Sequence, residues 1–122
     1  MAQVSTPTRR TLSSTTLVGD RVRNAQNEDL GKVEDLMIDL ESGRVAYCVL
    51  SFGGFLGMGE KLFAVPWRAL ALDAENHAFV LNVSKERLKD APGFDKDRWP
   101  DLSDTETRSR IYGFYNVRPD WN

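Results

Sequence analysis

The chain has 122 residues, 41% of them hydrophobic and 28% charged, with sixteen basic residues against eighteen acidic ones. This length predicts one domain with a real core and excludes two ordinary domains. Proteins that grip nucleic acid without sequence preference carry a basic excess, so a net charge of −2 argues against nucleic acid as the main partner. No stretch reaches the ~18 apolar residues of a membrane span, and the start lacks the apolar core of a secretory signal. We therefore expect a cytoplasmic protein.

The chain begins with a polar segment that has little to bury. Residues 1–14 are rich in Ser, Thr, Gln and Arg, and they predict a flexible N-terminal arm. Thr16–Val18 and Arg21–Arg23, separated by Gly19-Asp20, predict a short strand with a break in it. Asn24–Asp29 predicts a polar turn.

The next segment predicts a β-hairpin. Lys32–Leu40 reads as a half-buried strand, because apolar residues recur at every second position on one face. Glu41–Gly43 predicts a tight connection, in which Gly43 supplies the positive φ that such turns often need. Val45–Phe52 then pairs back against the first strand. The apolar face of Lys32–Leu40 consists of Leu36, Ile38 and Leu40.

Two apolar runs, Val45–Phe52 and Leu62–Trp67, predict neighbouring strands joined by a glycine-rich loop. Both faces of Val45–Phe52 are apolar. This strand therefore needs a barrel interior on one side and a helix, a terminal arm or a second subunit on the other. The loop carries apolar residues where a solvent-facing loop normally carries polar ones. It is either a protein-docking loop or a plug for the barrel mouth. The candidate docking residues are Phe52, Gly53, Gly54, Phe55, Leu56, Gly57 and Met58.

Two further short strands are predicted at Ala69–Asp73 and Ala78–Val83. Short strands at this regular spacing favour a small antiparallel barrel or sandwich of about six strands. Ser84 is placed to cap a short helix, Lys85–Asp90.

A second helix is predicted near the C-terminal end of the chain. Ser103 and Glu106 have the spacing of a capping box. Residues spaced three and four apart give this helix an apolar stripe, and two arginines fall on the opposite, solvent side. The stripe consists of Ile111, Phe114 and Tyr115, and the arginines are Arg108 and Arg110.

The residues that could support catalysis or metal binding are scattered. His77 and Cys48 are the only histidine and cysteine, and nothing in the sequence brings them together. The acidic group Asp95, Asp97 and Asp101 lacks the ligand and glycine positions of a calcium loop. The glycine-rich loop is followed by a strand, so the helix N-terminus of a phosphate-binding loop is missing. We expect no catalytic, metal or cofactor site and no enzyme activity.

The order and spacing of several segments resemble the PRC-barrel family. The segments are Gly19 with Val22, Asp29–Val33, Asp39–Gly43, Phe52–Gly59 and Phe63–Trp67, followed by Trp99–Asp101, Ser103-Asp104, Arg110–Tyr112, Tyr115 and Trp121. The tail in particular is similar to that of stand-alone bacterial members, which are related to the barrels of the reaction centre H subunit and of a ribosome maturation factor.

The resemblance implies a docking module without a common set of catalytic residues. We therefore predict an all-β protein with a PRC-type barrel over residues 15–91 and a helical extension, residues 92–122, packed on it. The expected function is a non-enzymatic protein-binding scaffold, a homodimer or higher homo-oligomer, whose protein partner is otherwise unknown. The alternative is an RNA- or ribosome-associated module of the maturation-factor type.

Overall fold

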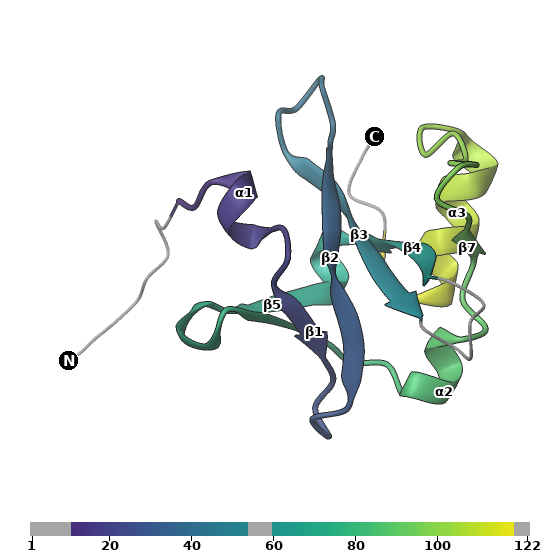
Figure 1. The fold of residues 1–122 in the computed structure, drawn as a ribbon. Coiled ribbons are helices and arrows are strands. Elements are labelled where there is room, and N and C mark those ends of the chain that lie inside the picture. Colours follow the sequence, from purple (N-terminus) through teal and green to yellow (C-terminus); the bar gives the residue numbers. More distant parts are fainter. Residues whose placement is uncertain (1–10, 54–59, 119–122) are drawn as a thin grey trace.

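The computed structural model describes residues 11–53 and 60–118, which form one seven-stranded sheet with short helices around it (Figure 1). The strand order is β5-β6-β1-β2-β3-β4-β7. Neighbouring strands run antiparallel except for β1 and β6, which are parallel. The strands are β1 (Arg21–Arg23), β2 (Asp29–Ile38), β3 (Val45–Gly53), β4 (Glu60–Pro66), β5 (Leu70–Asp73), β6 (Ala78–Leu81) and β7 (Gly93–Phe94).

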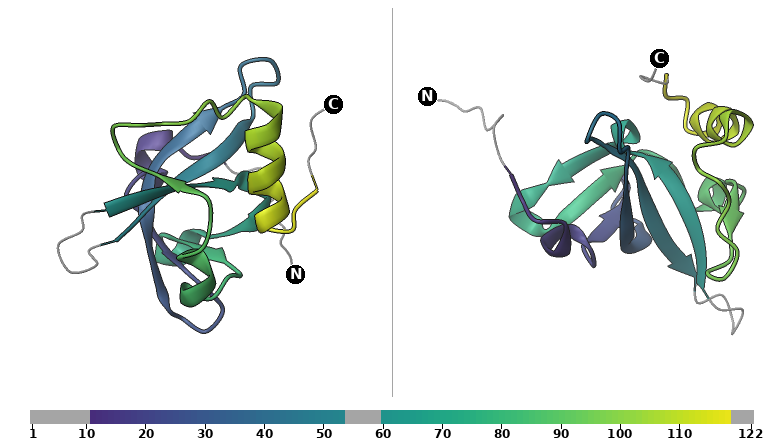
Figure 2. Two further views of the ribbon diagram at one scale, coloured as in Figure 1. Left: turned by 90° about the vertical axis from the view of Figure 1, so that its right-hand side faces the viewer. Right: turned by 90° about the horizontal axis from the view of Figure 1, so that it is seen from above.

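The sheet is strongly bent but not closed. Seen from above, β5 and β6 lie on one limb and β3 and β4 on the other (Figure 2). No ladder joins the end strands β5 and β7 within the described residues. The expected mostly β fold with short helices is thus confirmed, but the described sheet has seven strands rather than about six, contains one parallel pair and stays open. The additional strand, β7, is only two residues long, too short for a sequence pattern to reveal.

Strand β3 lies at the centre of the core. Every side chain from Tyr47 to Phe52 is buried, so both faces of the strand are covered, as its composition predicts. Its neighbours β2 and β4 supply the hydrogen-bonded ladders on its two edges. Other fully buried side chains come from strands along the whole sheet; they include Val22, Leu30, Val33, Phe63, Val65, Phe79 and Leu81.

The segment before β1 is helical rather than extended. Helix α1 (Ser14–Leu17) begins where the Ser13 hydroxyl accepts a hydrogen bond from the Thr16 amide at 3.2 Å, and it buries Leu17. The amide of Gly19 then donates to the carbonyl of Val33 at 2.8 Å. The expected strand over Thr16–Val18 is therefore wrong, because Ser13 offers a helix cap that outweighs the apolar run.

Strand β2 does not keep its predicted alternation. Leu36 is half-buried, but Ile38 is 48% exposed and Leu40, beyond the strand, is 91% exposed. Register shifts in the pairing with β3 fall between Val33 and Asp35 and between Met37 and Ile38. Each bulge turns the following side chains, so the apolar face predicted for this strand is lost at the tip of the hairpin.

Two further helices pack against the sheet, α2 against β2 and α3 against β4. Helix α2 (Lys85–Leu88) is capped by Ser84, as predicted, whereas the cap of α3 (Thr105–Phe114) is Asp104 rather than Ser103. The Asp104 carboxylate accepts from the Thr107 amide at 3.0 Å. Helix α3 lies beside the sheet (Figure 2). It buries Ile111, Tyr112 and, just past its end, Tyr115, while Phe114 is half-buried. No helix among the described residues is long and apolar enough to cross a membrane.

The polar turn between β1 and β2 is organised by Asn24, which is fully buried. Its side-chain oxygen accepts from the amides of Gln26 (3.1 Å) and Glu28 (2.8 Å), and its nitrogen donates to the Glu28 carboxylate (2.7 Å) and the Val83 carbonyl (3.1 Å). The same Glu28 oxygen accepts from the Lys85 amide at 3.2 Å. One side chain thus joins this turn to the segment that begins α2.

We expect Asn24→Ala to lower the free energy of unfolding by about 2–3 kcal/mol, because it removes partners from several backbone groups at once. Urea unfolding followed by circular dichroism measures this. Gln26→Ala in the same turn changes an exposed side chain and is the control. Equal stability of the two variants would contradict a structural role for Asn24.

Gly31 is required by both its backbone angle and its surroundings. Its φ is +107°, and a Cβ there would overlap the carbonyl oxygen of Ser51 in β3. We expect Gly31→Ala to lower unfolding stability by about 3 kcal/mol or more. Gly19 also has a positive φ (+97°) but open space around it, so Gly19→Ala should cost only about 1 kcal/mol. Similar losses in the two variants would show that crowding at Ser51 is unimportant.

Candidate protein-docking site

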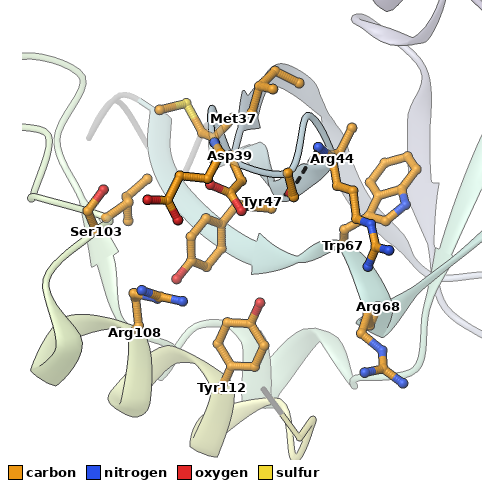
Figure 3. A pocket seen from close by; sticks show the side chains of 15 residues that line it. Met37, Asp39, Arg44, Tyr47, Trp67, Arg68, Ser103, Arg108 and Tyr112 are labelled. Atoms are coloured by element: carbon orange, nitrogen blue, oxygen red, sulfur yellow. Dashed lines mark hydrogen bonds between the residues drawn. The ribbon is translucent and has the colours of Figure 1, made fainter. Parts of the chain in front are cut away.

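A hollow of about 1000 Å³ lies where the β2–β3 hairpin, the short helix η2 (Trp67–Ala69) and α3 meet (Figure 3). Its lining combines apolar, aromatic and charged side chains from segments far apart in the sequence. The apolar and aromatic members include Met37, Ile38, Tyr47, Trp67, Leu102 and Tyr112. The charged members are Asp39, Glu41, Arg44, Arg68 and Arg108.

Asp39 holds the hairpin end of the hollow in place. Its carboxylate accepts from the Ser42 hydroxyl at 2.8 Å and from the Glu41 amide at 3.2 Å. Its backbone carbonyl accepts from the amide of Gly43, whose φ of +75° confirms the predicted left-handed turn position. The Asp39 amide donates to the Arg44 carbonyl at 2.8 Å, which fixes where the Arg44 side chain leaves the turn.

The opposite wall is made by α3 and the start of β3. The rings of Tyr47 and Tyr112 pack edge to face with centroids 5.9 Å apart. Both hydroxyls point into the space between the hairpin and the helix, and Arg108 extends toward the same space (Figure 3). On the other side of the hollow, Trp67 is held by an edge-to-face contact with the buried ring of Phe79 at 5.7 Å.

Burial raises the pKa of Tyr47 to about 12, the neighbouring Tyr112 adds to the rise, and the Arg108 guanidinium opposes it. This phenol is therefore neutral at physiological pH. The pKa of the Asp39 carboxyl is lowered, first by the Ser42 hydroxyl, then by the Glu41 amide, with a smaller contribution from the positive charge of Arg108. The hollow thus contains a neutral buried phenol, an ionised carboxylate and a guanidinium.

Arg108 is the main residue of this site whose position differs from the prediction. It was expected on the solvent side of the helix, but it is half-buried and lines the hollow. Arg108 lies four residues before Tyr112, and side chains at that spacing share a helix face. Because the predicted stripe omitted Tyr112, which is 4% exposed, the arginine was assigned to the wrong face. A stripe that included Tyr112 would have placed Arg108 on the face of the helix that packs toward the sheet.

Only the first two residues of the predicted docking loop can be described. Phe52 is buried, with 6% of its surface exposed, and the Lys85 ammonium lies 6.0 Å from its ring centroid. Gly53 is exposed at the end of β3. Residues 54–58, which include Phe55, Leu56 and Met58, lie outside the described part of the chain.

The residues considered for chemistry lie in unrelated surroundings. Cys48 is 1% exposed in the core, whereas His77 is exposed at the end of the short helix η3 (Ala74–Asn76), with a φ of 52°. Across residues 11–53 and 60–118, no group of three or more His, Cys, Asp or Glu side chains could hold a metal ion.

The comparison with protein families agrees with this architecture. Residues 10–88 match the PRC-barrel domain. The match covers more than half of the chain, and the protein belongs to the PRC-barrel family, a group of small binding and scaffold modules that is in general non-catalytic. No curated protein matches the chain. The matched residues contain every strand except β7, while α3 and its wall of the hollow follow the match.

We expect Cys48 to be inert toward thiol reagents in the folded protein. Burial raises the pKa of its thiol to about 12, so almost no thiolate, the reactive form, is present at pH 8. Ellman's reagent should react slowly in buffer and fully in denaturant. A native reaction as fast as that of the unfolded chain would contradict this placement.

Proposed function

We propose that this chain is a non-enzymatic protein-binding scaffold that acts in the cytoplasm and forms homo-oligomers. The observation that carries the proposal is the lining of the hollow. Tyr, Trp, Met and Arg are the residue types enriched at the centres of protein interfaces, and all four occur there. Arginine and aromatic side chains are also the usual hot spots of binding energy.

RNA binding, the alternative, has less support. Asp39 and Glu41 lie in the same hollow as the three arginines, and a nucleic acid would bring many phosphates close to these carboxylates. The net charge of −2 adds a general repulsion.

The glycine-rich loop remains our candidate for contacts between copies of the chain. Because Phe52 is buried, the proposed contact would be made by the residues that follow Gly53. Loss of a docking residue weakens assembly, whereas loss of a core residue lowers stability. A variant of the loop therefore shows whether the loop docks a second copy or packs in the core.

We expect the full chain to sediment as an oligomer over a wide concentration range. Phe55→Ser combined with Leu56→Ser should reduce it to a monomer with an almost unchanged melting temperature. Leu72→Ser, an exposed apolar site on β5, is the control and should leave the mass unchanged. A large fall in melting temperature with assembly intact would show that the loop is part of the core. A wild-type monomer at all concentrations would overturn the homo-oligomer.

A further inference from the structure

We propose that the hollow binds an acidic peptide segment of a partner protein, and that Arg108 and the Tyr47 hydroxyl together receive one of its carboxylates. The inference rests on the proposed protein-binding function and names the chemistry of the partner.

The Tyr47 hydroxyl supplies the first argument. Tyr47 is only 3% exposed, and its hydroxyl proton has no acceptor within the described part of the chain, although the Arg108 guanidinium, which can only donate, acts on the phenol oxygen. Ser51 and Tyr115 carry similar buried hydroxyls, but neither lines the hollow. A buried polar group without a partner is costly, and native structures rarely leave one without a reason. A ligand oxygen that accepts from this neutral phenol would give it a partner.

The charge around the hydroxyl determines what kind of oxygen suits it. The Arg108 guanidinium extends toward the Tyr47 hydroxyl (Figure 3), and its positive charge contributes to the lowered pKa of Asp39. A guanidinium presents a planar fork of donors that matches a carboxylate in a bidentate manner. With one more donor from the phenol, the site is complementary to an ionised carboxylate.

The remaining arginines indicate an extended ligand rather than a single small anion. Arg44 and Arg68 lie on the Trp67 side of the hollow, away from Arg108 (Figure 3). Met37 and Trp67 add apolar surface to the lining of the same hollow. A volume of about 1000 Å³ is at the upper end of the range for small-molecule sites, and a peptide with acidic residues separated by apolar ones fits this pattern.

The carboxylates on the rim argue against more highly charged ligands. Asp39 is kept ionised by its turn, and Glu41 follows it, so the hollow has three arginines against two carboxylates. This small positive excess suits single carboxylates with apolar spacing. It is poorly suited to a phosphate, which carries close to two charges, or to a phosphate backbone.

The test uses the full chain and a short fluorescein-labelled peptide in which Asp and Glu alternate with Leu and Tyr. Fluorescence anisotropy should show saturable binding. The matched peptide with Asn and Gln in place of the acids should bind about tenfold more weakly or not at all. A phosphoserine version and a single-stranded RNA of similar charge should also bind more weakly than the acidic peptide.

Two variants connect the binding to the proposed residues. Arg108→Gln should weaken the acidic peptide by about tenfold or more, whereas Arg110→Gln, the same change at an exposed position outside the hollow, should not. Tyr47→Phe should also weaken binding, with little change in the melting temperature, since the hydroxyl proton that it removes has no acceptor in the free protein. A merely structural tyrosine would not show this separation.

Several results would overturn the inference. They are equal binding of the acidic and amide peptides, stronger binding of the phosphopeptide or RNA, and equal losses from Arg108→Gln and Arg110→Gln. If the peptide fails to bind but the chain sediments as a loop-dependent oligomer, this inference fails while the proposed function stands. If Arg108→Gln abolishes the oligomer instead, the occupant of the hollow is a second copy of the chain, and the partner named here is wrong.

Discussion

Strand β3 carries buried side chains on both faces, so water has to be kept from both sides of it at once. Burying each of its large side chains contributes about 1.5–3 kcal/mol, which makes this strand a large part of the hydrophobic stabilisation of a small domain. The bent sheet supplies part of the cover. Helix α3 supplies more, through the contact of Tyr112 with Tyr47.

The elements predicted best from sequence are those whose signals are local. Strand β3, the turn at Gly43 and the cap at Ser84 depend on residues close together in the chain, and the structure has all three. For the turn and the cap the signal is a backbone angle or a hydrogen bond that few residue types can provide, and for β3 it is a short apolar run.

What the sequence could not show depends on contacts between distant segments. The parallel pairing of β1 with β6 joins residues more than fifty positions apart, and the bulges that expose Ile38 arise from the pairing of β2 with β3. The hollow is the same kind of feature. Its lining comes from the β2–β3 hairpin, from η2 and from α3, so no spacing along the chain brings Arg108 to Tyr47.

Two buried polar side chains of this fold, Asn24 and Tyr47, differ in how far their hydrogen bonds are satisfied. Asn24 is fully satisfied by four hydrogen bonds, so its interactions are already complete in the folded chain. The Tyr47 hydroxyl is buried with no acceptor for its proton within the described residues, and an unpaired buried donor costs about 1–3 kcal/mol. A ligand that provides the missing acceptor recovers part of this free energy on binding. The PRC-type strands contribute the tyrosine, and the helix beyond the family match contributes Arg108. On the proposed mode of binding, selectivity for a partner would arise where the helix packs on the sheet.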